Sequence, residues 1–380
     1  GSWFGLGVML NSVGDSVPLP GCSLRSRHLE TSTGCASLDG VLGGGLPNTS
    51  LLVIDELGSR AYADVLLRLF ISEGLHEEQD VLHVSSPLDR AEILEKLPAR
   101  LRKAEASAEG QERAGKQGGG GGGRDAEEMK IAWRYAPVKQ IESSVSRGGG
   151  ATYDLAQTME SESRKGRLLE RYPEKSRGKD GALSYQDLLA HLADLLALPE
   201  YSKKSKKEEP KKGEEDVVEK CGGGSQKSRN RLLRVAIRGL GGPLWSSHGE
   251  MRGFLARLAH LTRKSYVVIM ATCDSSSLSN DDRTALEHSS DAFFRLESMN
   301  AEEKKIFDPA HGYFRIVRLP RLSSLAPPAP PAVDLSFDLH RRHFDVKILH
   351  LPPALGDDEG EEGDTKKRKG ATPCGIAQDF

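Results

Sequence analysis

The stretch from Thr33 to Glu56 reads TGCASLDGVLGGGLPNTSLLVIDE, and it decides the fold. Its second half, Ser50 to Asp55, is a short apolar run that is rich in branched residues and bounded by turn formers. Such a run predicts a buried strand. Ahead of it, three consecutive glycines and Pro47 let the backbone turn sharply and then fix it. The stretch therefore predicts a strand that the chain enters through a tight turn.

After Glu56 the apolar spacing changes from that of a strand to that of a helix. Ser59 is placed as the N-cap of this helix, and Gly74 is expected just past its end. The run from Val81 to Val84 then predicts a second strand, so the three elements form the first strand-helix-strand unit of a parallel sheet. The apolar face of the helix consists of Tyr62, Val65, Leu66, Leu69 and Phe70.

The remaining periodic segments extend this sheet. Alternating apolar residues at 335–339 and 344–348, on either side of His340 to His343, predict an antiparallel hairpin. Together the patterns predict an α/β fold with a mostly parallel central sheet, flanking helices and a C-terminal antiparallel hairpin. The other predicted elements are a helix at 89–101, a strand at 129–135, a helix opened by Ser184 and Asp187, a strand at 232–238, a helix opened by a Ser247–Glu250 capping box, and strands at 266–271, 292–296 and 314–319.

Composition predicts how the 380 residues are divided. We expect a flexible N-terminal segment at 1–30, one domain at 31–355 and a charged tail at 356–380. The domain carries low-complexity insertions at about 103–128, which contains six consecutive glycines, and at about 200–230, which is rich in Lys and Glu. Both insertions are too polar to offset the entropy of ordering. The rest, roughly 300 residues, suffices for a single α/β domain.

Charge and cysteine usage exclude several classes of protein. The net charge of −2 fits neither a uniformly basic nucleic-acid binder nor an acidic solvating chain, so any RNA contact must come from a local patch. The five cysteines are scattered without a C-x-x-C pair, which indicates reduced thiols rather than a disulfide framework or a zinc site. The longest apolar runs have only about six residues, so we expect no membrane span and no membrane partner.

Residue patterns of common catalytic and metal sites do not occur in this sequence. The eleven histidines include no H-E-x-x-H spacing, and there is no G-x-S-x-G. His340 and His343 flank a predicted turn, where a surface role is expected rather than ligation. We therefore expect no metal site.

The opening TG…SLD…LGGGLP…SLLVI resembles the start of the core domain of RecA-like ATPases. Four later motifs and the chain's ending resemble signatures of a narrower family, that of the fourth subunit of the Elongator complex. The resemblance covers the chain from about Thr31 onward and implies a RecA-like sheet. The motifs are MKIAWRY at 129–135, GPLW at 242–245, LPRL at 319–322, HLPP at 350–353 and the ending at 374–380.

The position of the phosphate-binding loop departs from that of a working ATPase. A P-loop needs G-x-x-x-x-G-K-[ST], in which glycines admit the phosphates, Lys neutralises them and a hydroxyl binds Mg²⁺. Here residues 55–62 read DELGSRAY, and the Lys-Ser/Thr pair is missing. We call Gly58, Ser59 and Arg60 the degenerate nucleotide loop. Asp55 and Glu56 are expected to face the phosphate position and repel it, and a guanidinium at residue 60 does not reproduce the geometry of Lys.

The Walker B position is altered as well. The strand at 232–238 should end in an acid that orders Mg²⁺, but it ends in Ile237-Arg238-Gly239. With both positions lost, we expect no catalytic residues, no intrinsic NTP hydrolysis and no cofactor bound by this chain alone. ATP at an interface of a ring, completed by a partner's arginine, stays open.

RNA contact is expected at the loop after a central strand. In RecA-like rings such loops point into the pore, and here residues 272–286, TCDSSSLSNDDRTAL, occupy that place. We expect phosphate contacts from Arg283 in this loop and from Arg263 and Lys264 ahead of the strand. Acidic residues within the loop oppose a strong electrostatic contribution, so an ordinary flexible loop is an equal alternative.

The family resemblance implies a function that the residues alone do not. It implies a hexameric ring built with the fifth and sixth Elongator subunits. The ring engages tRNA and assists modification of the wobble uridine (U34), while the chemistry resides in the catalytic subcomplex. Residence in the cytoplasm, and also in the nucleus, would follow. Two alternatives stay open: an active RecA-type ATPase that acts on DNA, and a pure protein-interaction scaffold.

Overall fold

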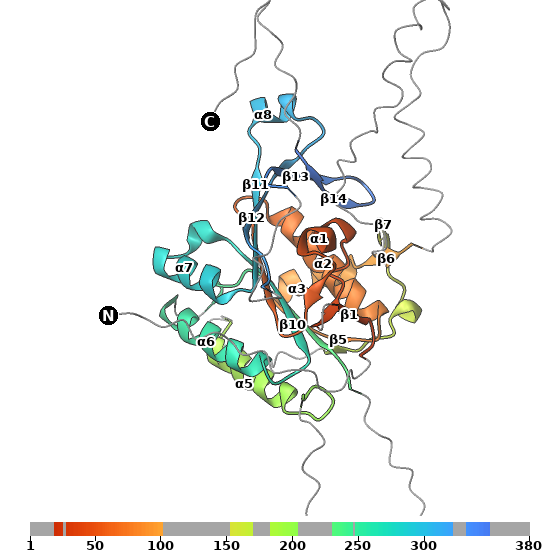
Figure 1. Cartoon of the computed structure of the whole chain (residues 1–380), viewed down its shortest axis with the longest axis vertical. Coiled ribbons are helices and arrows are strands. Elements are labelled where there is room, and N and C mark those ends of the chain that lie inside the picture. Colours follow the sequence, from red (N-terminus) through yellow and green to blue (C-terminus); the bar gives the residue numbers. More distant parts are fainter. Residues whose placement is uncertain are drawn as a thin grey trace, which may run out of the picture. The chain divides into compact units, whose positions relative to one another are not determined.

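The computed structural model describes residues 19–25, 28–101, 153–169, 183–203, 230–245, 248–321 and 332–349. Its centre is a nine-stranded sheet in the order β14-β13-β12-β11-β4-β10-β9-β5-β8 (Figure 1). The strand at 129–135, the insertion at 103–128, residues 204–229 of the second insertion and the tail lie outside the described residues. The division of the chain at residues 30 and 356 stays a prediction.

The sheet has a parallel part and an antiparallel part, as the sequence predicts. All neighbours from β8 to β11 run parallel, while β11 to β14 run antiparallel. The parallel strands are β4 (Leu51–Asp55), β5 (Asp80–Val84), β8 (Leu168–Leu169), β9 (Leu233–Ile237), β10 (Val267–Cys273) and β11 (Ala292–Ser298). The antiparallel strands are β12 (Gly312–Arg318), β13 (Leu335–Leu339) and β14 (Phe344–Ile348).

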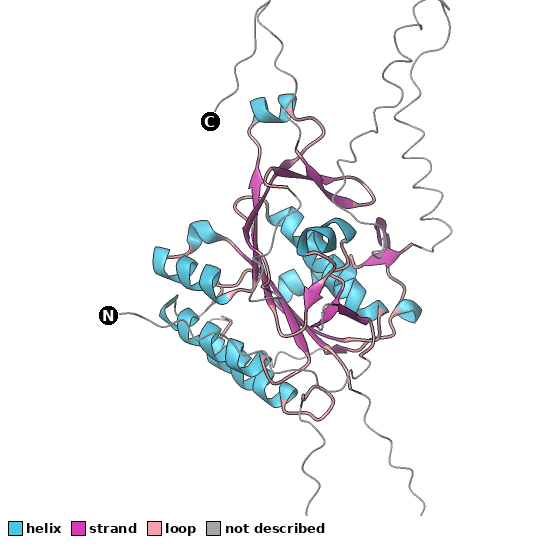
Figure 2. Ribbon diagram, in the orientation of Figure 1, coloured by secondary structure: helices cyan, strands magenta, loops and turns pink. Residues whose placement is uncertain are grey.

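Helices cover both faces of the parallel part (Figure 2). One face packs against α1 (Ala36–Leu42), α2 (Arg60–His76) and α3 (Pro87–Glu95). The other face packs against α5 (Tyr185–Leu196), α6 (Met251–Thr262) and α7 (Asn280–Ser289). A short helix, α8 (Ala301–Ile306), joins β11 to β12. Two apolar cores therefore lie on opposite faces of one sheet.

The strand β4 shows why this stretch decides the fold. Leu52 and Ile54 point into the core under α2, and Leu51 and Val53 point into the core under α6. A strand that is buried on both faces needs an unbroken apolar run, which the sequence supplies. Every residue of β4 is buried, and the strand pairs in parallel with both β10 and β11.

Two small sheets flank the domain. β1 (Cys22–Arg25), β2 (His28–Thr31) and β3 (Leu46–Pro47) form an antiparallel sheet, and β1 with most of β2 lies in the segment 1–30 that we expect to be flexible. β6 (Pro98–Arg100) pairs with β7 (Tyr153–Thr158). The helix expected at 89–101 is wrong at its C-terminal end: α3 stops at Glu95, because Pro98 cannot continue a helix and opens β6 instead.

One further difference arises at a buried polar group. The tract expected to lack structure from residue 200 begins with four described residues, because the hydroxyl of the buried Tyr201 donates to Asp80 at 2.6 Å.

Of the two predicted helix caps, Ser184 accepts from the amide of Asp187 at 3.3 Å. Ser247 lies outside the described residues, and the N-cap of α6 is Glu250.

Gly74 lies inside α2 rather than past its end. A Cβ at this position would lie 2.6 Å from Cδ of Arg234 and 2.9 Å from Cγ2 of Val81. The glycine therefore admits the fully buried guanidinium of Arg234. This guanidinium donates to Thr31 Oγ1 at 2.7 Å, to Gln79 and to two backbone carbonyls, and it packs over the ring of Phe70.

Substitution of glycine by alanine should have opposite effects on stability at position 74, where the added Cβ meets Arg234, and at position 253, where it meets no atom. Gly74→Ala should lower the free energy of unfolding by about 1–3 kcal/mol, because the methyl group displaces Arg234. Gly253→Ala in α6 should raise it by about 0.5–1 kcal/mol, because no atom lies within 4 Å of the added Cβ and alanine favours the helix. Urea unfolding of both variants measures the difference. An unchanged stability of Gly74→Ala would contradict this packing.

Candidate functional site

The degenerate nucleotide loop is a tight turn between β4 and α2. Four residues, from Glu56 to Ser59, connect the end of the strand to the start of the helix at Arg60. Leu57 and Gly58 both have positive φ, at 34° and 82°. Ser59 is the N-cap of α2 as predicted, but its hydroxyl makes no cap hydrogen bond and lies 2.9 Å from Oγ of Ser298 on β11. The buried serine therefore ties the loop to the neighbouring strand.

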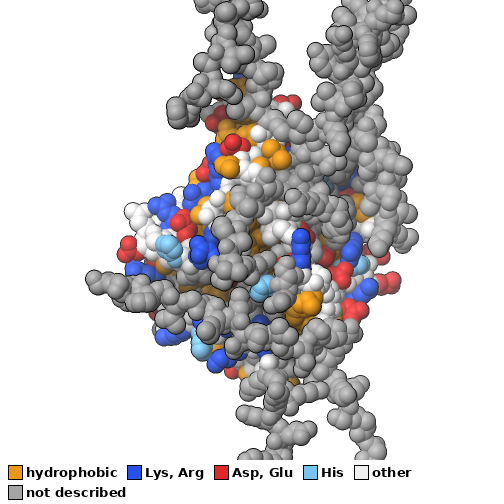
Figure 3. Space-filling model, viewed as in Figure 1, with side chains coloured by type: hydrophobic (Ala, Val, Ile, Leu, Met, Phe, Trp, Pro, Cys, Tyr) orange, Lys and Arg blue, Asp and Glu red, His pale blue; other side chains and the backbone are white. Residues whose placement is uncertain are grey.

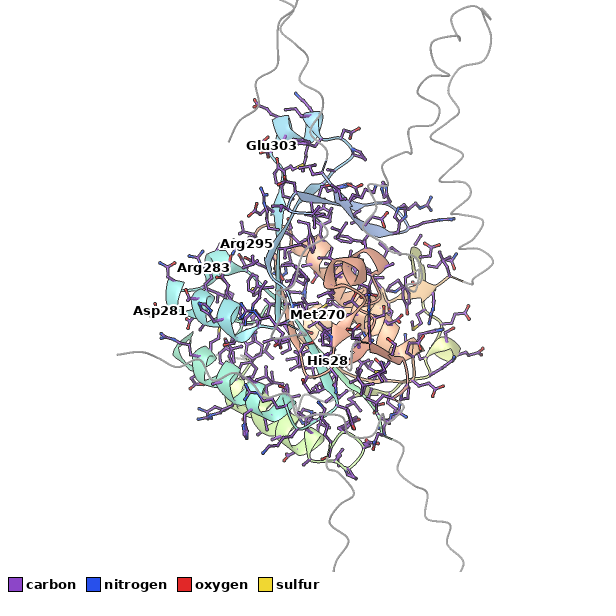
Figure 4. All side chains as sticks on the ribbon, in the orientation of Figure 1. His28, Met270, Asp281, Arg283, Arg295 and Glu303 are labelled. Carbon is purple, nitrogen blue, oxygen red and sulfur yellow. The ribbon has the colours of Figure 1, made fainter. Side chains whose placement is uncertain are left out.

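Asp55 does not face the position of a phosphate, contrary to the sequence-based expectation. Its carboxylate is fully buried and accepts from Nε of Arg295 at 2.7 Å and from the amide of Ser275 at 3.0 Å. Arg295, labelled on β11 in Figure 4, also contacts Glu287 on α7 at 3.3 Å. The acid at the end of β4 thus links this strand to β11 and to the residues that follow β10.

An ion pair stands at the position where the resemblance to RecA-like ATPases would place a Walker B acid. Arg238, which directly follows β9, donates through Nε and Nη2 to the two carboxylate oxygens of Asp64, at 2.7 and 2.6 Å. Only 5% of the Arg238 side chain and 10% of the Asp64 side chain are exposed. Because Asp64 lies in the second turn of α2, this fork-to-fork pair links the carboxyl end of β9 to the helix that follows the degenerate nucleotide loop.

Glu56 completes the cluster of charges. Its carboxylate is buried, and burial raises its pKa above the usual 4.5, while a hydrogen bond with Thr272 and the charge of Arg60 lower it. Carboxylates at 55, 56, 64 and 287 therefore stand with guanidiniums at 60, 68, 238 and 295, where Arg68 donates to the carbonyl of Asp64 at 3.3 Å. The four positive charges are matched by four carboxylates. This arrangement offers no excess of positive charge to a triphosphate, which a working P-loop must neutralise.

The residues predicted to contact RNA do not form one patch. Arg263 and Lys264 are exposed and precede β10, whereas Arg283 follows the opposite end of the same strand. Residues 272–286 are mostly not a loop, because β10 extends to Cys273 and α7 begins at Asn280. Ser279 caps α7 by accepting from the amide of Asp282 at 3.1 Å, a Ser-x-x-Asp signal that the sequence contains.

Arg283 lies on α7 next to acidic neighbours (Figure 4). Its Nη2 donates to Oδ1 of Asn280 at 2.7 Å. Arg252 of α6 lies 3.4 Å from Asp281 and 3.6 Å from Asp282. Acidic and basic side chains are intermingled on this side of the surface (Figure 3). Contact with phosphates here would rest on individual arginines rather than on a strong field.

Two findings bear on metals and membranes. His340, His343 and Asp345 place three metal-ligating atoms within 4.8 Å of one another, although the sequence predicts no metal site. Asp345 follows His343 by two residues, so strand alternation places both side chains on one face, a signal that the sequence contains. Among the helices that the structure describes, none is long and apolar enough to span a bilayer.

Comparison with known proteins identifies relatives over most of the chain. The sequence model of the PAXNEB protein family matches residues 16–377. A Xenopus laevis protein named Elongator complex protein 4 is 30% identical, over 89% of this chain and 84% of its own length. Proteins of the same name from Mus musculus and Schizosaccharomyces pombe are 29% and 26% identical, over 89% and 90% of this chain and 80% and 90% of their own lengths.

The ion pair between Arg238 and Asp64 predicts strong coupling. Asp64→Ala should lower the free energy of unfolding by about 3–5 kcal/mol, because it leaves a buried guanidinium without its main partner. The double variant Asp64→Leu, Arg238→Met should lose less than Asp64→Ala alone, because it removes both charges. Asp281→Ala serves as the control: its pair with Arg252 is exposed, so the change should stay within about 0.5 kcal/mol. Urea unfolding measures the loss of stability in the double variant and in its two single variants. A loss in the double variant equal to the sum of the two single losses would contradict the pairing.

Proposed function

The chain belongs to the PAXNEB protein family, and we propose that it acts as a non-catalytic, RecA-like subunit of the Elongator complex. In this proposal it assembles with the fifth and sixth Elongator subunits into a hexameric ring. The ring engages tRNA and assists modification of the wobble uridine, and the catalytic subcomplex performs the chemistry. The name Elongator complex protein 4, carried by relatives from vertebrates and a yeast, supports membership of the complex.

The ion pair of Arg238 with Asp64 carries the non-catalytic part of the proposal. A Walker B acid would hold Mg²⁺ from the end of β9, but the residue there is a cation that both carboxylate oxygens of Asp64 already engage. Asp55, at the end of β4, is likewise engaged by Arg295. These contacts support a chain that binds no nucleotide cofactor by itself. An ATP site at a ring interface would need cations from a partner subunit.

Contacts with tRNA are proposed for the basic residues at the two ends of β10. Arg283 would face the pore of the ring from α7, and Arg263 with Lys264 would contact a separate stretch of RNA backbone. The exposure of Arg263 and Lys264 supports such contacts. For the finished complex we propose the cytoplasm, with the nucleus as a second location.

Native mass spectrometry of this chain mixed with the fifth and sixth Elongator subunits tests the proposal. We expect a hexamer that contains two copies of each protein, because a ring subunit must contact unlike neighbours on two sides. This chain alone should give no hexamer. Recovery of the chain as a monomer or a self-assembled hexamer from the mixture would contradict the ring.

The same assembled ring then tests the role in RNA binding. Filter binding should detect tRNA affinity that falls as salt rises, and Arg283→Ala should weaken it several-fold while the hexamer stays intact. Arg252→Ala, on the neighbouring helix and paired with acids, is the matched control and should change the affinity little. A ring without salt-sensitive tRNA binding would favour the pure scaffold, and unchanged affinity of Arg283→Ala would remove that residue from the contact.

A further inference from the structure

The tip of the β13–β14 hairpin concentrates ligands of a kind that bind metal ions. The hairpin closes through a short turn in which the amide of His340 donates to the carbonyl of His343 at 2.9 Å. The two imidazole rings face each other, with their centroids 4.5 Å apart. Asp338, before the turn, pairs directly across the hairpin with Asp345, after it. Two histidines and two carboxylates are therefore held together by the backbone of one hairpin.

The distances fit a single ion. One ligand atom from each of His340, His343 and Asp345 lies within 4.8 Å of the other two, and Nε2 of His343 is 3.1 Å from Oδ2 of Asp345. Metal–ligand bonds of about 2.1 Å in a tetrahedral site place the ligand atoms about 3.4 Å apart. Small side-chain rotations of these half-buried residues would bring all three atoms onto one ion.

Asp338 adds a buried carboxylate beside these three residues. This side chain is only 2% exposed and stands opposite a second carboxylate, an arrangement of like charges that destabilises a sheet. Lys347 contacts its Oδ2 at 2.7 Å, but Oδ1 is buried and has no hydrogen-bond partner among the described residues. Oδ2 also lies 3.8 Å from Nε2 of His340. A buried carboxylate oxygen without a partner costs free energy, so Asp338 favours positive charge near the tip of the hairpin.

Three basic side chains stand near these ligands. Lys347 is engaged with Asp338, and Nε of Arg342 lies 3.8 Å from Asp154 on β7. Arg341 is exposed in the turn. Their positive charges repel a metal ion. An ion bound through imidazole nitrogens tolerates this repulsion better than an ion that is held only by its attraction to carboxylates.

We propose that His340, His343 and Asp345 bind one divalent transition-metal ion of the zinc class, with Asp338 as the supporting carboxylate. Two imidazole nitrogens and one carboxylate oxygen suit Zn²⁺ and Co²⁺ rather than Mg²⁺ or Ca²⁺, which prefer oxygen ligands only. The fourth position would be open to water, because the histidine side chains are 38% and 23% exposed. The ion would fasten the hairpin whose strand β14 contacts α1 through the Val346 amide and Ser37 Oγ, 2.9 Å apart.

Isothermal titration of the untagged full chain with zinc sulfate tests the site. We expect one Zn²⁺ per chain, and His343→Ala or Asp345→Asn should weaken binding at least tenfold. His288→Ala, which removes an exposed histidine on α7, is the matched control and should bind as the unchanged chain does. Zn²⁺ should also raise the thermal midpoint, EDTA should reverse the rise, and His343→Ala should abolish it.

Other outcomes would overturn the proposal. Zinc that fails to bind, or that binds as tightly to His343→Ala as to the unchanged chain, would place no metal at the hairpin. Equal binding of Mg²⁺ would indicate a site defined by carboxylates alone. Circular dichroism of the metal-free variants separates lost ligands from lost folding. If His343→Ala does not fold, His343→Gln keeps most of the side-chain volume and decides the question in its place.

Discussion

The paired charges of Arg238 and Asp64 fasten α2 to the sheet. Both groups are almost fully buried, so each depends on the other to replace lost water. Arg238 directly follows strand β9, and β9 itself carries Arg234 four residues earlier on the same face. Arg234 reaches under α2 to Gln79 and Thr31, in the space that Gly74 leaves free. Two guanidiniums, one near the start of β9 and one directly after its end, thus anchor α2 on the sheet.

This anchoring has a chemical consequence at the carboxyl ends of the strands. In an open α/β sheet this edge is where ligands bind, and in P-loop enzymes the helix after the first strand meets the phosphates there. Here Asp55 is engaged by Arg295 and Ser275, and Asp64 by Arg238. The charged side chains at this edge therefore join strands to helices. These contacts support the proposal that the chain binds no nucleotide by itself.

Local patterns predicted the fold well, and non-local contacts account for the misses. The strands and the hairpin were predictable because burial imposes alternation or an unbroken apolar run, as in β4. Gly74 was misplaced because its role depends on Arg234, which is 160 positions away in the chain. The cap at Ser279 follows a Ser-x-x-Asp pattern that is visible in the sequence. Asp345 follows His343 by two residues, so strand alternation alone places both on one face, whereas the partners of Asp55 and Arg238 come from distant elements.

Equilibrium binding of Mg·ATP to the isolated full chain tests the central claim most directly. A fluorescent ATP analogue with Mg²⁺, titrated to about 1 mM, near the top of the range in which enzymes commonly bind substrates, should give no saturable signal. The account predicts this because the guanidiniums at 60, 238 and 295 are already balanced by carboxylates. Saturable binding of one nucleotide per chain that Arg60→Ala weakens would contradict it.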